Sequence, residues 1–185
     1  MTNDAALADK GVRQRLIARS VWVTIPGTFA VIGGAYAALP PIAGMGDVGA
    51  RLSLAARWLV VALLPYVAVC CTIAGARFIE GSHNPVAGGE SERLKIHCRV
   101  MQNTLEQLAW LAIVVLGLAA LLDPAEVRLI PVACVFFAAA RMLYWWGYLQ
   151  PGTIARAPGV QLTFTLNLGL LALALVALAR SLVAR

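Results

Sequence analysis

The hydrophobic and polar positions of the chain fall into long blocks along the sequence. Five blocks are almost wholly apolar, and each is close to the roughly 20 residues that an α-helix needs to cross a bilayer. This pattern predicts five membrane-spanning helices, over residues 21–39, 58–75, 105–122, 129–148 and 162–179.

Proline and glycine mark several of the connections between these blocks: Pro40-Pro41, residues 81–89, Asp123-Pro124 and Pro151-Gly152. Both residue types interrupt helices, so the blocks should form separate helices. The connections are short, and none leaves room for a second, soluble domain. The predicted fold class is therefore all-α and integral to the membrane, with several passes.

The first apolar block supports two interpretations. It follows a basic leader and ends in Ala35-Tyr36-Ala37, a pattern that a signal peptidase accepts. We predict that residues 1–57 form an N-terminal cytoplasmic segment plus an additional transmembrane helix, with a cleaved signal peptide as the alternative. Residues 58–185 then form a four-helix transmembrane domain, and its orientation is the same in both cases.

Composition agrees with a membrane location. Apolar residues make up 61% of the 185 residues and charged residues 13%, about half the roughly 25% of a typical soluble domain. These values exclude a disordered chain, a coiled coil and an ordinary water-soluble enzyme. The formal charge of +6 could suggest nucleic acid, but basic loops of membrane proteins explain it, so we expect no nucleic-acid partner. The four cysteines and two histidines lack the spacing of a zinc site, so we expect no metal.

The basic residues also predict an orientation. With the N-terminus in the cytoplasm, nine basic residues outside the apolar blocks face the cytoplasm and five face the other side, which satisfies the positive-inside rule. Arg141 lies within a block. The cytoplasmic set is Lys10, Arg13, Arg15, Arg19, Arg77, Arg93, Lys95, Arg99 and Arg156; the opposite set is Arg51, Arg57, Arg128, Arg180 and Arg185.

Ionisable residues inside a membrane helix are costly and therefore indicate function by default. In the third helix, which we expect to begin before its apolar block, Arg99, Asn103 and Glu106 are spaced i, i+4 and i+7 on one face. In the fourth helix, Arg141, Tyr144 and Tyr148 are spaced i, i+3 and i+7 on one face. Both stripes lie toward the predicted cytoplasmic end.

Arg77, at the end of the second predicted helix, and Arg156, after the fourth, are expected at the same depth in the membrane as these two stripes. Together the two stripes match a small, zwitterionic, peptide-like anion, because arginine binds carboxylates, Glu106 can bind an ammonium group and the amide and phenols can bind a peptide backbone. The alternative is purely structural. Polar side chains also join membrane helices, and Glu106 would then only neutralise Arg141.

The run from Arg99 to Gln107, RVMQNTLEQ, resembles the RxxxNxxE signature of the MAPEG family, the membrane-associated proteins in eicosanoid and glutathione metabolism. The run from Arg141 to Tyr148, RMLYWWGY, followed by Arg156, resembles the next helix of that family and its catalytic arginine. Arg77 resembles an arginine that closes the family's first helix. The resemblance covers about residues 58–185.

The resemblance implies a four-helix transmembrane bundle that assembles as a homotrimer, with the helix over residues 21–39 as an extra N-terminal element. It implies that glutathione is the cosubstrate and binds between neighbouring subunits near the cytosolic face. Arg156 would stabilise the glutathione thiolate. The glutathione-binding residues carried over are Arg99, Asn103, Glu106, Tyr144 and Tyr148, with Arg77 and Arg141 as helpers.

The predicted function is a membrane glutathione transferase, with peroxidase activity as a variant, whose partners are membrane lipid and a lipophilic electrophile. A non-catalytic lipid-binding or scaffold protein on the same fold is the first alternative, because some family members bind lipid without catalysis. A small transporter or channel is the second, but it requires polar residues spread through several spans, and the blocks over 21–39 and 162–179 hold no charged residue.

Overall fold

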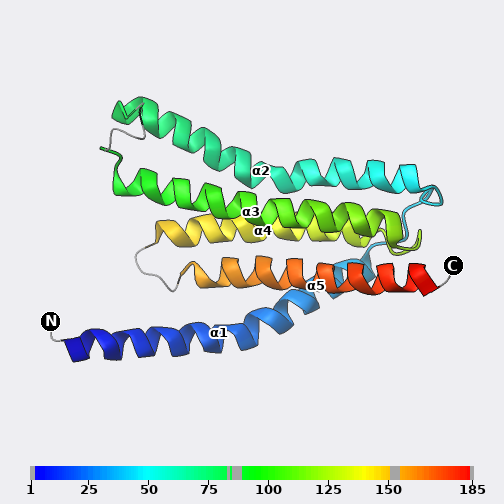
Figure 1. Ribbon diagram of the computed structural model, residues 1–185, viewed down its shortest axis with the longest axis horizontal. Helices are drawn as coiled ribbons and strands as arrows, with labels where there is room; N and C mark the ends of the chain where they lie inside the picture. The colour runs from blue at the N-terminus through cyan, green and yellow to red at the C-terminus, as the bar shows by residue number, and fades with distance from the viewer. Residues whose placement is uncertain (1–2, 83, 85–88, 151–154, 184–185) are drawn as a thin grey trace.

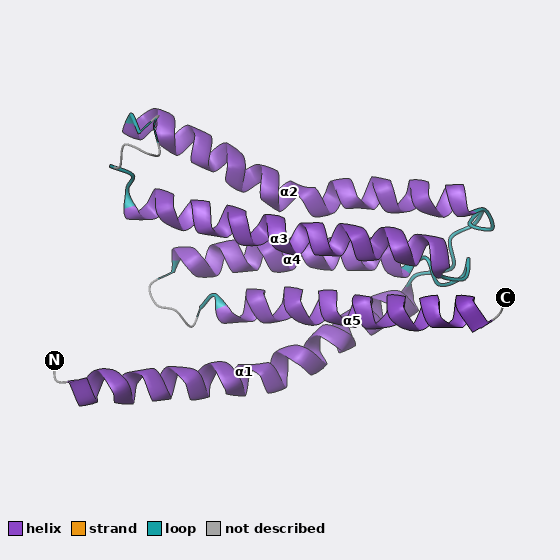
Figure 2. Ribbon diagram, viewed as in Figure 1, coloured by secondary structure: helices purple, strands orange, loops and turns teal. Residues whose placement is uncertain are grey.

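A computed structural model describes residues 3–82, 84, 89–150 and 155–183. Within these ranges the chain forms five α-helices, which Figure 2 shows in purple. Their bounds are Asn3–Ala38 (α1), Val48–Glu80 (α2), Glu92–Leu121 (α3), Leu129–Leu149 (α4) and Ala157–Val183 (α5). All five are long and apolar enough to cross a membrane. The predicted all-α membrane fold is therefore confirmed.

The helices extend beyond the apolar blocks that predicted them. α3 begins at Glu92, well before residue 105, so Arg99 lies inside the helix as expected. With 30 residues α3 is about 45 Å long at 1.5 Å per residue, longer than the roughly 30 Å hydrocarbon core of a bilayer. Its polar first turns can therefore extend past the hydrocarbon.

Local signals fix the helix ends. The Asp47 side chain accepts a hydrogen bond from the Ala50 backbone N–H (3.0 Å) and caps α2. α2 ends at Glu80 and is followed by Gly81, whose φ of 68° suits a residue without a Cβ. Ser91 caps α3 by accepting a hydrogen bond from the Leu94 N–H (3.1 Å). These caps satisfy backbone groups that the helix itself leaves unpaired.

Helices α2 to α5 form an antiparallel bundle (Figure 1). The last turns of α2 and α4 and the first turns of α3 and α5 lie at one end, which we call the Arg156 end. The connections before α2 and before α4 lie at the other, the Arg128 end. α3 and α4 each pack against the other three helices of the bundle.

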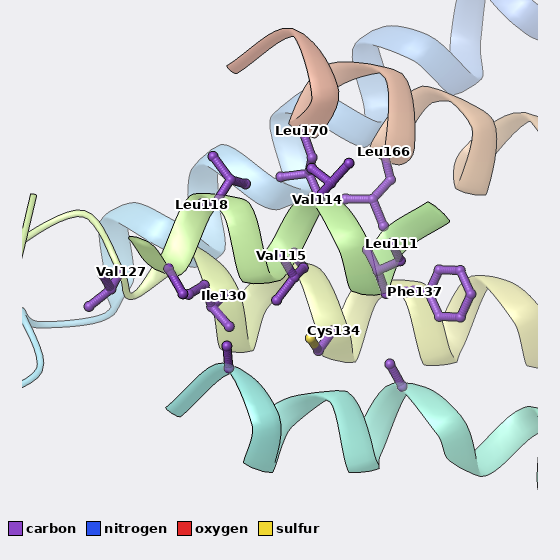
Figure 3. Packing of buried hydrophobic residues seen from close by; sticks show 14 of the residues in the cluster. Leu111, Val114, Val115, Leu118, Val127, Ile130, Cys134, Phe137, Leu166 and Leu170 are labelled. Carbon is purple, nitrogen blue, oxygen red and sulfur yellow. The ribbon is translucent and has the colours of Figure 1, made fainter. Parts of the chain in front are cut away.

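The main core lies between α3, α4, α5 and α2 (Figure 3). It is built from aliphatic side chains of α3 facing those of α4 and α5, with small Ala55 and Ala62 of α2 allowing close approach. The other principal members, all 5% exposed or less, are Leu111, Val115, Leu118, Ile130, Cys134, Phe137, Leu166 and Leu170.

Helix α1 lies outside this bundle and packs on α5 and α4 (Figure 1). The middle of α1 is bonded to Gln161 of α5. Gln161 accepts a hydrogen bond from the Thr24 hydroxyl (2.7 Å) and donates one to the Ile17 carbonyl (3.1 Å). Phe29 packs over Gly169, so α5 offers a site where α1 comes close. α1 is bent (Figure 1) and contains Pro26, which cannot donate the helical hydrogen bond of its position and so favours a bend.

Candidate functional site

The centre of the candidate site is Arg141 of α4, whose side chain is 1% exposed. Its Nη2 donates to Asn103 Oδ1 (3.0 Å) and to Thr104 Oγ1 (2.8 Å) of α3, and Nε also donates to Thr104 (3.2 Å). Its Nη1 donates to Thr163 Oγ1 of α5 (3.4 Å). A buried charge is tolerated only when its hydrogen bonds are satisfied, so Arg141 ties α3, α4 and α5 together.

Aromatic rings continue from this arginine toward the Arg156 end. The Arg141 guanidinium lies 3.9 Å from the Tyr144 ring centroid, and the rings of Tyr144 and Tyr148 meet edge to face at 5.1 Å. The Arg156 guanidinium lies 4.7 Å from the Tyr148 ring. We call this line of four side chains the arginine–tyrosine row. Cation–π contacts of this kind hold the phenols and both guanidinium groups in fixed positions.

The position of Arg156 depends on close packing between α4 and α5. A Cβ at Gly159 would lie 2.5 Å from the Tyr144 Cα, closer than side chains pack. Gly147 of α4 likewise faces the backbone of Ala155 and Arg156. Glycine at both positions therefore brings Arg156 back against Tyr148. The predicted connection at Pro151-Gly152 lies outside the described residues.

The polar stripe of α3 divides into two parts. Asn103 turns inward to Arg141, whereas Arg99, Gln102 and Glu106 are exposed on the outer face of the single chain. Glu106 accepts a hydrogen bond from Gln102 Nε2 (2.9 Å). In the described part of the chain Arg141 is neutralised by no carboxylate, and its acceptors are an amide and two hydroxyls.

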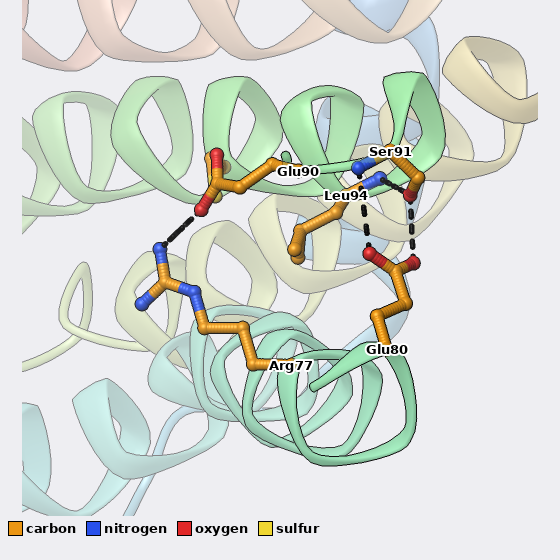
Figure 4. A network of polar contacts seen from close by, with 6 residues as sticks. Arg77, Glu80, Glu90, Ser91 and Leu94 are labelled. Carbon is orange, nitrogen blue, oxygen red and sulfur yellow. Dashed lines mark hydrogen bonds and ion pairs between the residues drawn. The ribbon is translucent and has the colours of Figure 1, made fainter. Parts of the chain in front are cut away.

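Arg77 of α2 lies at the same end but has different partners (Figure 4). Its Nη2 forms an ion pair with Glu90 (2.9 Å) and lies 4.0 Å from Cys98 Sγ. Next to it, Glu80 accepts a hydrogen bond from the Ser91 hydroxyl (2.7 Å) and so braces the α2–α3 connection. Arg77 therefore stands apart from the arginine–tyrosine row.

Several residues that hold the site together were not predicted from the sequence. Thr104 and Thr163 supply acceptors to Arg141, and Gly159 sets the distance between α4 and α5. Trp145 donates its indole N–H to His97 Nδ1 (3.0 Å), a further link between α4 and α3. One sequence feature could have pointed to Thr104, which is its position next to Asn103 of the α3 stripe.

The geometry defines a class of protein: a multi-pass helical membrane protein with a cluster of arginine, tyrosine and amide groups toward one end of its helix bundle. The sequence matches the model of the MAPEG family over residues 55–176, about two thirds of the chain, and the chain belongs to this family. Its function falls at the family level within membrane glutathione and eicosanoid metabolism. The search of curated proteins and the search of solved structures gave no match. Helix α1 lies outside the matched residues.

Proposed function

We propose that this protein is a membrane-bound glutathione transferase that works as a homotrimer. The arginine–tyrosine row carries the proposal, because two cations and two phenols follow one another in successive contacts toward one end of the bundle. Arg156 is the catalytic residue and stabilises the glutathione thiolate. The residues that bind glutathione are Arg99, Asn103, Glu106, Tyr144 and Tyr148, assisted by Arg77 and Arg141.

The outer face of α3 supports a site completed by a second subunit. Arg99 and Glu106 are exposed on a helix long and apolar enough to span the membrane. Charged side chains facing lipid are costly, and in membrane proteins they face other helices or aqueous cavities. A neighbouring copy of the chain on this face removes that cost and leaves a polar space for a zwitterionic ligand between subunits.

The two arginines of the row have different roles in this proposal. Arg141 is fully buried and its donors are occupied by Asn103, Thr104 and Thr163, so it acts as a positioning residue for Asn103 and Tyr144. Arg156 is only half-buried and sits at the end of the row. It is the guanidinium within reach of a thiol that arrives from water.

The chemistry requires the thiolate form of glutathione. A free thiol with a pKa of about 8.5 is only about 3% ionised at pH 7. A nearby guanidinium favours the thiolate, and lowering the pKa by about two units requires about 2.7 kcal/mol. The sulfur then forms a bond to an electrophilic carbon of a lipophilic substrate that arrives from the bilayer, and the displaced group leaves with its electron pair. Peroxide reduction by the same thiolate is the expected side activity.

A glutathione titration of the detergent-purified protein tests this function, with thiolate absorbance followed in the ultraviolet. We expect a saturable signal that Arg156→Ala abolishes and Arg156→Lys partly restores. Equilibrium dialysis with labelled glutathione separates binding from ionisation, and Arg156→Ala should weaken binding less than it weakens the thiolate signal. Arg57→Ala removes an exposed arginine from the first third of α2 and serves as the matched control.

Two outcomes contradict the proposal at different points. Full thiolate signal in Arg156→Ala would assign thiol activation to another residue. Absence of any glutathione binding in a folded oligomer would favour the non-catalytic, lipid-binding member of the family.

A further inference from the structure

A cavity between α1 and α4 lies at the Arg128 end, away from the arginine–tyrosine row. Its volume is about 790 Å³, within the 300–1,000 Å³ range of small-molecule sites. Helix α1 forms one wall and the first half of α4 the other, with Trp58 of α2 also on the lining. Because α1 lies outside the residues matched by the family model, this cavity depends on an element that the match does not include.

The cavity is long and apolar. On α4 its lining residues follow one face of the helix from Pro131 to Ala139, a distance of about 12 Å at 1.5 Å per residue. Val135 and Ala139 are exposed in the chain, so the cavity opens sideways toward the bilayer. Pro40 and Pro41 also line the cavity, and because proline lacks a backbone N–H, neither presents a backbone donor to this apolar space.

One charged side chain lines this space, Arg128, at the point where the connection meets α4. Its Nη1 donates to the Leu39 carbonyl, and its guanidinium lies 4.2 Å from the Tyr36 ring centroid. These contacts fix the guanidinium between α1 and α4. Its Nε is buried without an acceptor, and within the described residues no carboxylate pairs with its charge. A guanidinium has five N–H donors, so donors remain for a ligand.

We propose that this cavity binds a single-chain lipid with a carboxylate, a free fatty acid, whose head pairs with Arg128 and whose chain lies between α1 and α4. Charge complementarity selects the head, since an uncompensated cation in an apolar lining favours one anion. The length and apolar character of the α4 face select the chain. The lining offers no second cation or polar cluster for the larger head of a phospholipid.

Photolabelling of the full-length protein in detergent tests the proposal, with palmitic acid that carries a diazirine in its chain as the probe. Mass spectrometry of the digested protein should locate the label on residues 31–42 and 131–139. Unlabelled palmitate should compete with the probe at least about tenfold better than methyl palmitate, because the ester lacks the charge that strengthens a hydrogen bond to Arg128.

Two variants separate the head from the chain. Arg128→Gln should weaken palmitate competition about tenfold and leave methyl palmitate unchanged. Ala139→Trp fills the cavity and should reduce labelling about tenfold, with Val135→Trp as a second filling variant if the first does not fold. The matched controls are Arg57→Gln, which removes an exposed arginine, and Ala172→Trp, which adds the same bulk to an exposed position on α5 outside the cavity.

The proposal fails if the label spreads evenly over the exposed faces of α2, α4 and α5, which would show bulk lipid only. It also fails if palmitate and methyl palmitate compete equally, or if Ala139→Trp labels as fully as Ala172→Trp. Crosslinks between two chains across this face would assign the cavity to a second copy instead. Each outcome is independent of glutathione binding at the Arg156 end.

Discussion

The two ends of the bundle each hold an arginine against a tyrosine, but their surroundings differ. At the Arg156 end the row is flanked by Asn103, Thr104 and the exposed charges of α3, and Arg141 is fully bonded inside the protein. At the Arg128 end the guanidinium lies over Tyr36 beside an apolar cavity. The same arginine–tyrosine contact therefore occurs once among polar side chains and once beside an apolar cavity.

This difference shows that an arginine–tyrosine contact does not by itself define a glutathione site. Polar neighbours decide the ligand. Where amides, hydroxyls and a carboxylate surround the pair, a peptide-like zwitterion fits. Where only aliphatic and aromatic side chains surround it, a lipid anion fits.

Removing each arginine should affect stability to a different extent. Arg141→Ala should lower the free energy of unfolding by about 3 kcal/mol, because it leaves a cavity among side chains of three helices. Arg128→Ala should cost about 1 kcal/mol, since it removes a half-buried side chain with one hydrogen bond to the chain. Denaturant unfolding in detergent measures both. Equal losses would contradict the contrast between the two ends.

Glycines allow close backbone packing of α4 on α5 at the Arg156 end. Gly159→Ala should lower the free energy of unfolding by about 2 kcal/mol, because the new Cβ meets the backbone of Tyr144. It should also displace Arg156 and weaken the thiolate signal of bound glutathione. Gly117→Ala on α3 is the matched control, because a Cβ there meets no atom within 4 Å. Similar unfolding curves for the two variants would refute this packing argument.

Removing a hydroxyl acceptor of Arg141 should have a smaller effect on the free energy of unfolding. Thr163→Val keeps the side-chain shape and removes the acceptor of Nη1, at an expected loss of about 1 kcal/mol in unfolding free energy. Thr165→Val, two residues further along α5, is the control because Thr165 makes no hydrogen bond to Arg141 among the described residues. The proposal that Arg141 positions the site predicts weaker glutathione binding only in Thr163→Val.

The smallest expected effect on the four-helix bundle itself concerns the attachment of α1. Gln161→Leu removes the hydrogen bonds to Ser20, Thr24 and the Ile17 carbonyl, each worth about 0.6 kcal/mol in membranes. Limited proteolysis should then cut α1 from the bundle sooner, and the mass of the untreated protein shows whether residues 21–39 are retained. Unchanged proteolysis would mean that apolar packing, such as Phe29 on Gly169, holds α1 alone.

The sequence predicted the helices well because membrane insertion depends on apolar length along the chain. Each predicted apolar block lies almost entirely within one helix, and Arg99 falls inside α3 as expected. The stripe spacing also brought Asn103, Arg141, Tyr144 and Tyr148 into one connected cluster. The roles assigned to these residues, the trimer, and the cytoplasmic orientation stay predictions.

The partners of each polar side chain were not predictable from spacing. Asn103 and Glu106 share a sequence stripe, yet one turns toward Arg141 and the other faces outward with Gln102. Arg77 pairs with Glu90 instead of joining the row. A stripe specifies a face of about 100° on one helix, but the rotation of that helix against its neighbours decides which edge of the face is buried.

The sequence by itself determined that this is a membrane protein with five spanning helices and with charged residues at particular positions along them. It could do so because the cost of burying a charge in lipid acts on each helix separately. The tertiary structure decided that Thr104 and Thr163 complete Arg141, that Gly159 brings Arg156 to Tyr148, and that α1 forms a cavity with α4. These features arise from contacts between helices distant in the sequence. Such contacts depend on how side chains from several helices fit together, and this fit cannot be read from the residue pattern of one helix.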